Sequence, residues 1–116
     1  MNATVEEKSF HFAIRIVNLS RYLGNKNEFV LSKQILRSGT SIGANIAESQ
    51  QAQSTADFRS KLNIALKEAS ETNYWLRLLN ATNYLTNAEF SSLIDDCREI
   101  EKMLTSIIKT SKNTTK

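Results

Sequence analysis

The chain has 116 residues, which suits a single domain with a real hydrophobic core. It has no proline, three glycines and 41% hydrophobic residues, a composition that interrupts few helices and therefore favours an all-α protein. A net charge of +3 permits contact with nucleic acid without requiring it, and one cysteine excludes an internal disulfide. No apolar run reaches the roughly 18 residues of a membrane span, and we expect a cytoplasmic protein without a signal peptide.

The first predicted helix covers about residues 4–23, with Gly24 and Asn25 as its stop signal. Its apolar residues form two faces about 140° apart at roughly 100° per residue. One face holds Phe10, Ala13, Ile14 and Val17, and the second holds Phe12, Ile16, Leu19 and Leu23. A helix in a monomeric bundle needs one apolar face. The second face therefore indicates either an unusually buried helix or a subunit interface, and we predict the interface.

The second predicted helix covers about residues 29–51, and its middle is built from small and polar residues, RSGTSIGANIAE. Gly39, Gly43 and Ala47 recur every four residues, so they form a ridge that another helix backbone can approach closely. Its core positions are Leu31, Ile35, Ile42 and Ile46. A separate polar stripe holds Arg37, Ser41 and Glu48, which favours polar contacts over simple apolar burial.

The third predicted helix covers about residues 55–80 and begins at a capping signal, Ser54 with Asp57. Its core stripe is Phe58, Leu62, Ala65, Ala69 and Leu76, and its second face carries Ile64, Glu68, Glu71, Trp75 and Leu78. We predict that the apolar members of this second face, Ile64, Trp75 and Leu78, also belong to the subunit interface. Its two glutamates complete a predicted buried polar network of Arg37, Ser41, Glu48, Glu68 and Glu71.

The fourth predicted helix covers about residues 87–109, after the capping pair Thr86 and Glu89. Its apolar residues alternate spacings of three and four, as in a left-handed bundle: Phe90, Leu93, Cys97, Ile100, Leu104 and Ile107. Residues 110–116 are polar and are predicted to form a flexible tail. Short connections between long helices predict an antiparallel up-down-up-down four-helix bundle, formed as one domain by residues 1–116.

A basic stripe on the fourth helix is the candidate nucleic-acid site. Arg98, Lys102 and Lys109 lie within about 40° of one another, and Lys112 follows one turn later if the helix continues. A line of positive charge is sufficient to contact a phosphate backbone. The alternative is a solvated face whose last lysines stabilise the helix C-terminus.

Catalytic and metal-binding patterns are weak in this sequence. His11 is the single histidine, too few for a Glu-x-x-His di-iron site or a structural metal site. Cys97 lies on a core face, and SGTSIG lacks the lysine and the preceding strand of a phosphate-binding loop. Glu68 and Glu71 have no further catalytic group beside them. We therefore expect no enzyme activity, no metal and no cofactor.

Two segments point to a family. Residues 37–79, beginning RSGTSIGANIAESQQ and ending ETNYWLRLL, resemble the four-helix-bundle proteins encoded in intervening sequences of bacterial 23S ribosomal RNA genes, and KSFHFAIRIVNLSRYL resembles their first helix. The resemblance implies a ring-like homo-oligomer, commonly a pentamer, and extends to the accessory variability determinant of diversity-generating retroelements, which works with nucleic acid. The matching residues, interpreted as assembly residues, are Arg37, Ser38, Ser41, Asn45, Glu48, Glu71 and Trp75.

Two functions follow as hypotheses. The first is a non-enzymatic homo-oligomer that binds RNA, DNA or a nucleoprotein through basic faces repeated around a ring, where several weak patches engage one strand together. The second is a structural or protein-interaction module that binds no nucleic acid.

Overall fold

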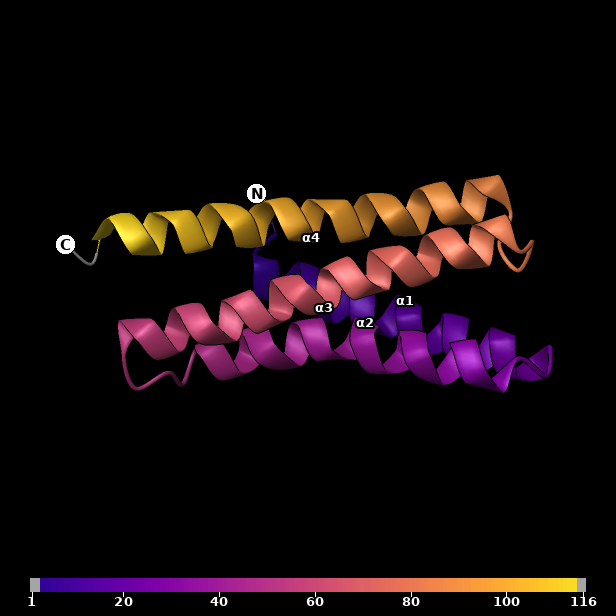
Figure 1. Ribbon diagram of the computed structural model, residues 1–116, viewed down its shortest axis with the longest axis horizontal. Helices are drawn as coiled ribbons and strands as arrows, with labels where there is room; N and C mark the ends of the chain where they lie inside the picture. Colours follow the sequence, from indigo (N-terminus) through magenta and orange to yellow (C-terminus); the bar gives the residue numbers. More distant parts are fainter. Residues whose placement is uncertain (1–2, 115–116) are drawn as a thin grey trace.

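The structure is a computed structural model that describes residues 3–114, and these residues form four α-helices without strands (Figure 1). The helices are α1 (Val5–Asn25), α2 (Phe29–Ser49), α3 (Thr55–Ala81) and α4 (Asn87–Thr114). The prediction of an all-α fold is confirmed.

Two of the helices begin at capping signals that the sequence identifies. Before α4, the Glu89 amide donates to the Thr86 hydroxyl at 3.1 Å and the Glu89 carboxylate accepts from the Thr86 amide at 2.9 Å. Before α3, the Ser54 hydroxyl accepts from the Asp57 amide at 3.0 Å, while the Asp57 carboxylate accepts from the Gln53 amide. The first pair is a complete capping box and the second is half of one.

Asparagines with a left-handed backbone lie within the α1–α2 and α3–α4 connections, at the same end of the bundle. Asn27 and Asn83 have φ values of 62° and 68°, in the left-handed region that asparagine tolerates better than most residues. α1 continues through Gly24 to Asn25 and ends two residues after its predicted end. In contrast, α2 ends at Ser49, two residues before its predicted end.

The prediction of a flexible tail from residue 110 is wrong for residues 110–114, which continue α4 to Thr114. Ser111 is buried at 8% exposure, and its carbonyl accepts a hydrogen bond from Arg59 Nη1 of α3 at 3.4 Å. Packing against α3 therefore holds a polar segment in the helix, an effect that the local composition does not reveal. Residues 115 and 116 lie outside the described residues.

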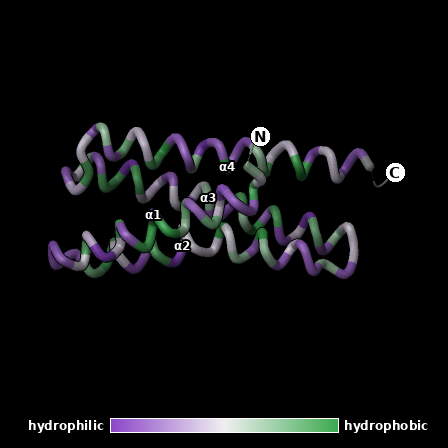
Figure 2. Tube along the Cα trace, turned by 180° about the vertical axis from the view of Figure 1, so that it is seen from behind, coloured by the Kyte–Doolittle hydropathy of each residue, from purple (hydrophilic) through white to green (hydrophobic). Residues whose placement is uncertain are grey.

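Successive helices are antiparallel neighbours, and α4 returns beside α1. Four seams, the lines along which neighbouring helices pack, therefore run along the bundle: α1/α2, α2/α3, α3/α4 and α4/α1. The described chain measures 50 × 24 × 23 Å. Hydrophobic and hydrophilic positions alternate along each helix (Figure 2), as expected when every helix has one face in the core.

The core includes the second apolar face of α1. Phe12, Ile16 and Leu23 are at most 1% exposed, and Leu19 is 7% exposed. The predicted interface role of these four residues is therefore wrong, because they fill the axis of the bundle within a single chain. Helical periodicity identifies two apolar faces on α1, but it does not say which of them turns inward.

The closest approach of α1 and α2 occurs at Gly39. A Cβ atom placed on Gly39 would lie 2.7 Å from Cγ2 and 2.8 Å from Cγ1 of Ile16, distances shorter than side chains tolerate. At Gly43 the nearest atom would be the Ser9 carbonyl oxygen at 3.4 Å, an ordinary contact. The predicted close crossing is confirmed at Gly39, whereas Gly43 leaves room for a methyl group.

Buried hydroxyl pairs cross both seams of α2. At the α1/α2 seam the hydroxyls of Ser20 and Ser32 are 2.7 Å apart, and at the α2/α3 seam the Thr72 hydroxyl donates to that of Ser38 at 2.9 Å. In the described part of the chain, no buried side-chain nitrogen or oxygen lacks a hydrogen-bond partner. The core therefore contains polar groups without leaving them unsatisfied.

The bundle is incomplete at one end. α1 begins near the middle of the long axis, whereas α4 continues to the far end beside the connection between α2 and α3 (Figures 1 and 2). The last turns of α4 therefore pack without α1 as a neighbour. A hollow lined by residues of α2, α3, α4 and the α2–α3 connection lies beside them.

Candidate nucleic-acid interface and oligomer faces

The basic stripe predicted on the fourth helix lies on the surface of the bundle. Arg98, Lys102 and Lys109 are exposed, and so is Lys112 one turn further along the extended α4. The stripe faces away from the core positions of α4, such as Cys97 and Leu104, which are fully buried. The helix therefore separates its packing face from its basic face, as the sequence predicts.

Four cations on the other seams, Lys8, Arg15, Arg37 and Lys61, pair with nearby carboxylates. At the α4/α1 seam Lys8 Nζ lies 2.8 Å from Glu99 Oε1, and Arg15 Nη1 lies 2.6 Å from Asp96 Oδ2. The α2/α3 seam holds the pair Lys61–Glu48 and the pairs of Arg37 with Glu68 and Glu71.

In contrast, Arg98, Lys102 and Lys109 form no ion pair within the described residues. Asp95, one turn before Arg98, is exposed as well and forms no ion pair with any described residue. The stripe therefore keeps its positive charge available.

The α3/α4 seam brings a further cation to the edge of this stripe. Asn73 Nδ2 of α3 donates to Glu101 Oε1 of α4 at 3.2 Å, and Arg77 Nε donates to Asn73 Oδ1 at 2.9 Å. Glu101 directly precedes Lys102 in the chain. Sequence reasoning missed Arg77 because its position depends on the register between two helices, which periodicity within one helix cannot supply.

The predicted buried polar network is wrong in two respects. Arg37 pairs with Glu68 and Glu71, as expected, but its side chain is 51% exposed. Glu48 belongs to a separate pair with Lys61, at 3.2 Å, and its side chain is 59% exposed.

The remaining member of that network, Ser41, donates its hydroxyl to the carbonyl of Arg37 within α2. The charged side chains of the α2/α3 seam lie at its exposed edge, outside the core. We therefore expect Arg37→Ala to cost less than about 1 kcal/mol in one chain.

Glu71 connects this ion-pair cluster to Trp75. The Trp75 indole donates to Glu71 Oε2 at 3.0 Å, and Arg37 contacts the same oxygen. The indole hydrogen bond, followed by Arg37, holds the pKa of the Glu71 carboxyl below its usual range. The carboxylate therefore stays charged under mildly acidic conditions.

Trp75 is the single tryptophan, so its fluorescence reports this contact directly. We expect an acid titration whose midpoint lies below the ordinary pKa of glutamate, because protonation of Glu71 weakens the indole hydrogen bond. Since the folded-state pKa is lowered, the stability that Glu71 contributes is present above its unfolded-state pKa and is lost as pH falls through the folded-state pKa. Glu71→Gln should abolish the transition and Arg37→Ala should raise its midpoint. An unchanged midpoint in Arg37→Ala would contradict the ion pair.

An exposed apolar surface lies at the α1/α2 seam. It is formed on α1 by the first apolar face, for which the sequence predicts no interface. Phe10 is 70% exposed and Ile14 is 45% exposed. Small residues of α2 continue the surface, and a groove of about 410 Å³ lies between the two helices. We call this surface the α1/α2 apolar face and define it by Phe10, Ala13, Ile14, Val17, Thr40, Gly43, Ala44 and Ala47.

A second partly exposed apolar surface lies on α3, where the sequence predicts an interface. Ile64 is 40% exposed, and Trp75 and Leu78 are half-buried. We call these three residues the α3 apolar face. They lie beside the α2/α3 ion pairs and on a different side of the bundle from Phe10 and Ile14.

Groups with catalytic potential are poorly placed for chemistry. Cys97 is buried, its Sγ lies 3.3 Å from the Ala69 carbonyl oxygen, and burial raises the pKa of its thiol to about 12. His11 is exposed, and no group of three potential metal-ligating His, Cys, Asp or Glu residues occurs between residues 3 and 114.

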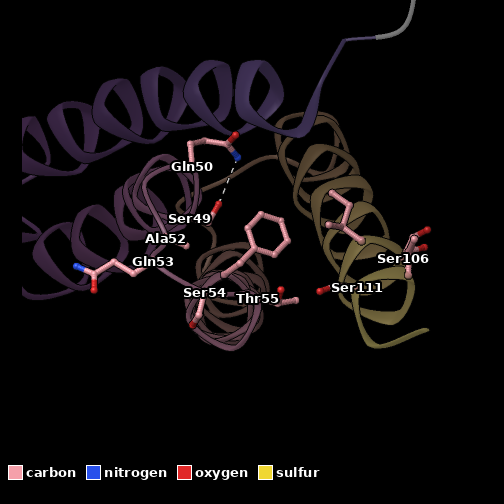
Figure 3. A pocket seen from close by; sticks show the side chains of 11 residues that line it. Ser49, Gln50, Ala52, Gln53, Ser54, Thr55, Ser106 and Ser111 are labelled. Atoms are coloured by element: carbon pink, nitrogen blue, oxygen red, sulfur yellow. Dashed lines mark hydrogen bonds between the residues drawn. The ribbon is translucent and has the colours of Figure 1, made fainter. Parts of the chain in front are cut away.

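The hollow at the open end of the bundle has a volume of about 670 Å³ (Figure 3). Hydroxyls and amides from three helices and the α2–α3 connection surround it, with Phe58 and Ile107 as apolar lining. Ser49 is already bonded, to the Ile46 carbonyl and to Gln50. Among the described residues, no charged side chain lines the hollow, and these residues offer no group that would select an ionic ligand.

Comparisons with known proteins agree with this architecture. Residues 1–106 match the family of 23S rRNA-intervening sequence proteins. The chain is also similar to the crystal structure of a protein with unknown function from the S23 ribosomal protein family of Bacteroides thetaiotaomicron VPI-5482. That protein is 63% identical, with a TM-score of 0.91 over 91% of this chain and 99% of the other. No curated protein matches the chain.

None of the helices described between residues 3 and 114 combines the length and apolar character needed to cross a membrane. The family match spans the four helices and all but the last turns of α4. The chain therefore belongs to the 23S rRNA-intervening sequence protein family.

Proposed function

We propose that the protein is a non-enzymatic, self-associating helical bundle that binds RNA or DNA through the basic stripe of α4, presented once by every subunit. The carrying observation is that Arg98, Lys102 and Lys109 lie in line on one exposed face of α4 and form no ion pair within the described residues, whereas four cations on the α4/α1 and α2/α3 seams pair with carboxylates. A line of available positive charge releases counterions from a phosphate backbone when it binds.

Self-association is supported by apolar side chains that stay exposed outside the core of a single subunit. The α1/α2 apolar face and the α3 apolar face lie on different sides of one subunit, so contact between them is heterologous and repeats from subunit to subunit. Such contacts close into a ring when the rotation permits, and the family resemblance implies a pentamer. A ring brings several three-charge stripes to one strand, which raises a weak affinity through multivalency.

The absence of enzyme activity and a cytoplasmic location are parts of the same proposal. The paired glutamates on the α3 helix are engaged by Arg37, and the buried thiol of Cys97 stays protonated near neutral pH. Neither group is available as a general base or nucleophile at neutral pH.

The test is a triple variant, Arg98→Ala, Lys102→Ala and Lys109→Ala, compared with the parent in salt titrations of binding to RNA and single-stranded DNA. Loss of three phosphate contacts should lower the slope of log affinity against log salt by about 2 for a single strand. A matched triple variant, Arg21→Ala, Lys26→Ala and Lys33→Ala, removes the same charge from exposed positions around the α1–α2 connection and should retain the parent slope.

Circular dichroism and sedimentation must first show that both triple variants are folded and assembled like the parent. Equal binding by the parent and the α4 variant would remove this stripe as the binding surface. Failure of the parent to bind any RNA or DNA would instead favour an interaction module that uses the apolar faces.

A further inference from the structure

We infer that the α3/α4 face takes single-stranded nucleic acid, with the exposed ring of Tyr74 stacking on a base beside the α4 stripe. The inference deepens the proposed function and rests on it. Within the basic stripe itself, the sequence offers no aromatic residue that could contact a base. The packing of α3 against α4 supplies one.

The Tyr74 ring is both accessible and held in place. Its side chain is on the surface, with the residue 50% exposed. Trp75 packs against it edge to face, with ring centroids 5.1 Å apart, and the Arg77 guanidinium lies 5.7 Å from the Tyr74 ring centroid. A ring held by its neighbours loses little freedom when a base stacks on it, and the adjacent guanidinium can contact the phosphate of the same nucleotide.

The contact between Asn73 and Glu101 brings the α3 segment that carries Tyr74 next to the α4 segment that carries Arg98 and Lys102. Tyr74 follows Asn73 directly in α3, and Lys102 follows Glu101 directly in α4, while the two polar groups are 3.2 Å apart. Arg98 lies one turn from Glu101. Because α3 and α4 are antiparallel, Tyr74 lies near the level of Arg98, and Arg77 lies about one turn further toward the start of α4.

This combination favours a single strand over a duplex. In a duplex the flat faces of the bases are covered by their neighbours, and an exposed tyrosine can reach them only at a flipped or terminal base. In a single strand the bases are open, and an aromatic platform next to a row of cations is the usual arrangement of proteins that bind such strands without reading sequence.

The test compares three labelled probes of about 12 nucleotides: an oligoadenylate, an abasic strand of equal length, and a duplex of the same length. The parent should bind the oligoadenylate more tightly than the abasic strand, since only the former can stack. Tyr74→Ala should weaken oligoadenylate binding by roughly 5- to 100-fold, to the level of the abasic strand, and should leave duplex binding unchanged. Tyr74→Phe should retain the parent preference, because the ring remains.

Tyr22→Ala is the matched control, because Tyr22 is 41% exposed and lies beneath Lys26 on a different seam. It should behave as the parent does, with DNA and RNA versions of each probe run in parallel. An unchanged preference of Tyr74→Ala for bases over abasic strand would overturn the inference, while loss of all binding in the α4 triple variant would leave the proposed function standing. A parent that binds none of the probes would overturn both.

Discussion

Gly39→Ala is expected to lower the free energy of unfolding by about 1–3 kcal/mol, although alanine is the better helix former by about 0.5–1 kcal/mol. The new Cβ atom would lie 2.7 Å from Cγ2 and 2.8 Å from Cγ1 of Ile16, whose side chain is fully buried. Because these atoms are next to the Ile16 backbone, relief requires a shift of α1 against α2 rather than rotation of a flexible end.

The other two glycines provide internal controls. No glycine has a positive φ, so all three accept alanine without backbone strain. Nothing lies within 4 Å of a Cβ atom on Gly24, and Gly43 has only ordinary contact with Ser9. Gly24→Ala and Gly43→Ala should be neutral or stabilising by up to about 1 kcal/mol.

Chemical denaturation followed by circular dichroism measures all three glycine variants. A double variant with Ile16→Ala should show a favourable coupling energy, because the smaller residue 16 removes the clash. If the free energy of unfolding of Gly39→Ala is no lower than that of Gly24→Ala, the close contact with Ile16 does not limit side-chain size at residue 39.

Phe12→Ala should destabilise the single chain, whereas Phe10→Ala should weaken assembly, although the two phenylalanines are only two residues apart. Phe12 is 1% exposed in the core, and its truncation should cost about 3–5 kcal/mol. Phe10 is 70% exposed, and its truncation should change the stability of a single chain by less than about 0.5 kcal/mol. Its effect should appear in assembly, because it is the largest side chain of the α1/α2 apolar face.

Denaturation at low protein concentration separates the two effects, since the stability of an oligomer depends on concentration. Sedimentation of Phe10→Ala should show dissociation at concentrations where the parent remains assembled. A Phe12→Ala variant that folds normally but dissociates would instead restore the interface role predicted from the sequence. If the parent sediments as a monomer at micromolar concentration, the assembly proposal fails.

Much of the fold could be predicted from local signals. Capping pairs, hydrophobic spacing and the absence of proline predict four helices and their antiparallel order, because each is a property of neighbouring residues along the chain. The core positions of α4 follow in the same way. The end of α4 does not, because Ser111 is held by packing against α3 and not by its own helix propensity.

The candidate surfaces were less accessible to sequence reasoning. The basic stripe lies on one helix, and its exposure follows from the position of the core face. The two apolar faces of α1 are equivalent by periodicity, so only the tertiary arrangement decides that Phe12 is buried and Phe10 is exposed. Arg77 and Tyr74 approach α4 through a contact between distant residues, Asn73 and Glu101, for which the sequence offers no local signal.

The two buried hydroxyl pairs of α2 also disfavour alternative alignments of α2 along its neighbouring helices. If α2 slid by one turn against its neighbours, apolar side chains could still meet apolar side chains. Ser20 and Ser32 would then lose each other and Ser38 would lose Thr72, at about 1–3 kcal/mol for each group left unsatisfied, whereas Thr72 would keep the Glu68 carbonyl within α3. Four small hydroxyls therefore widen the energy gap between the native alignment and its nearest competitors, although they contribute little net stability themselves.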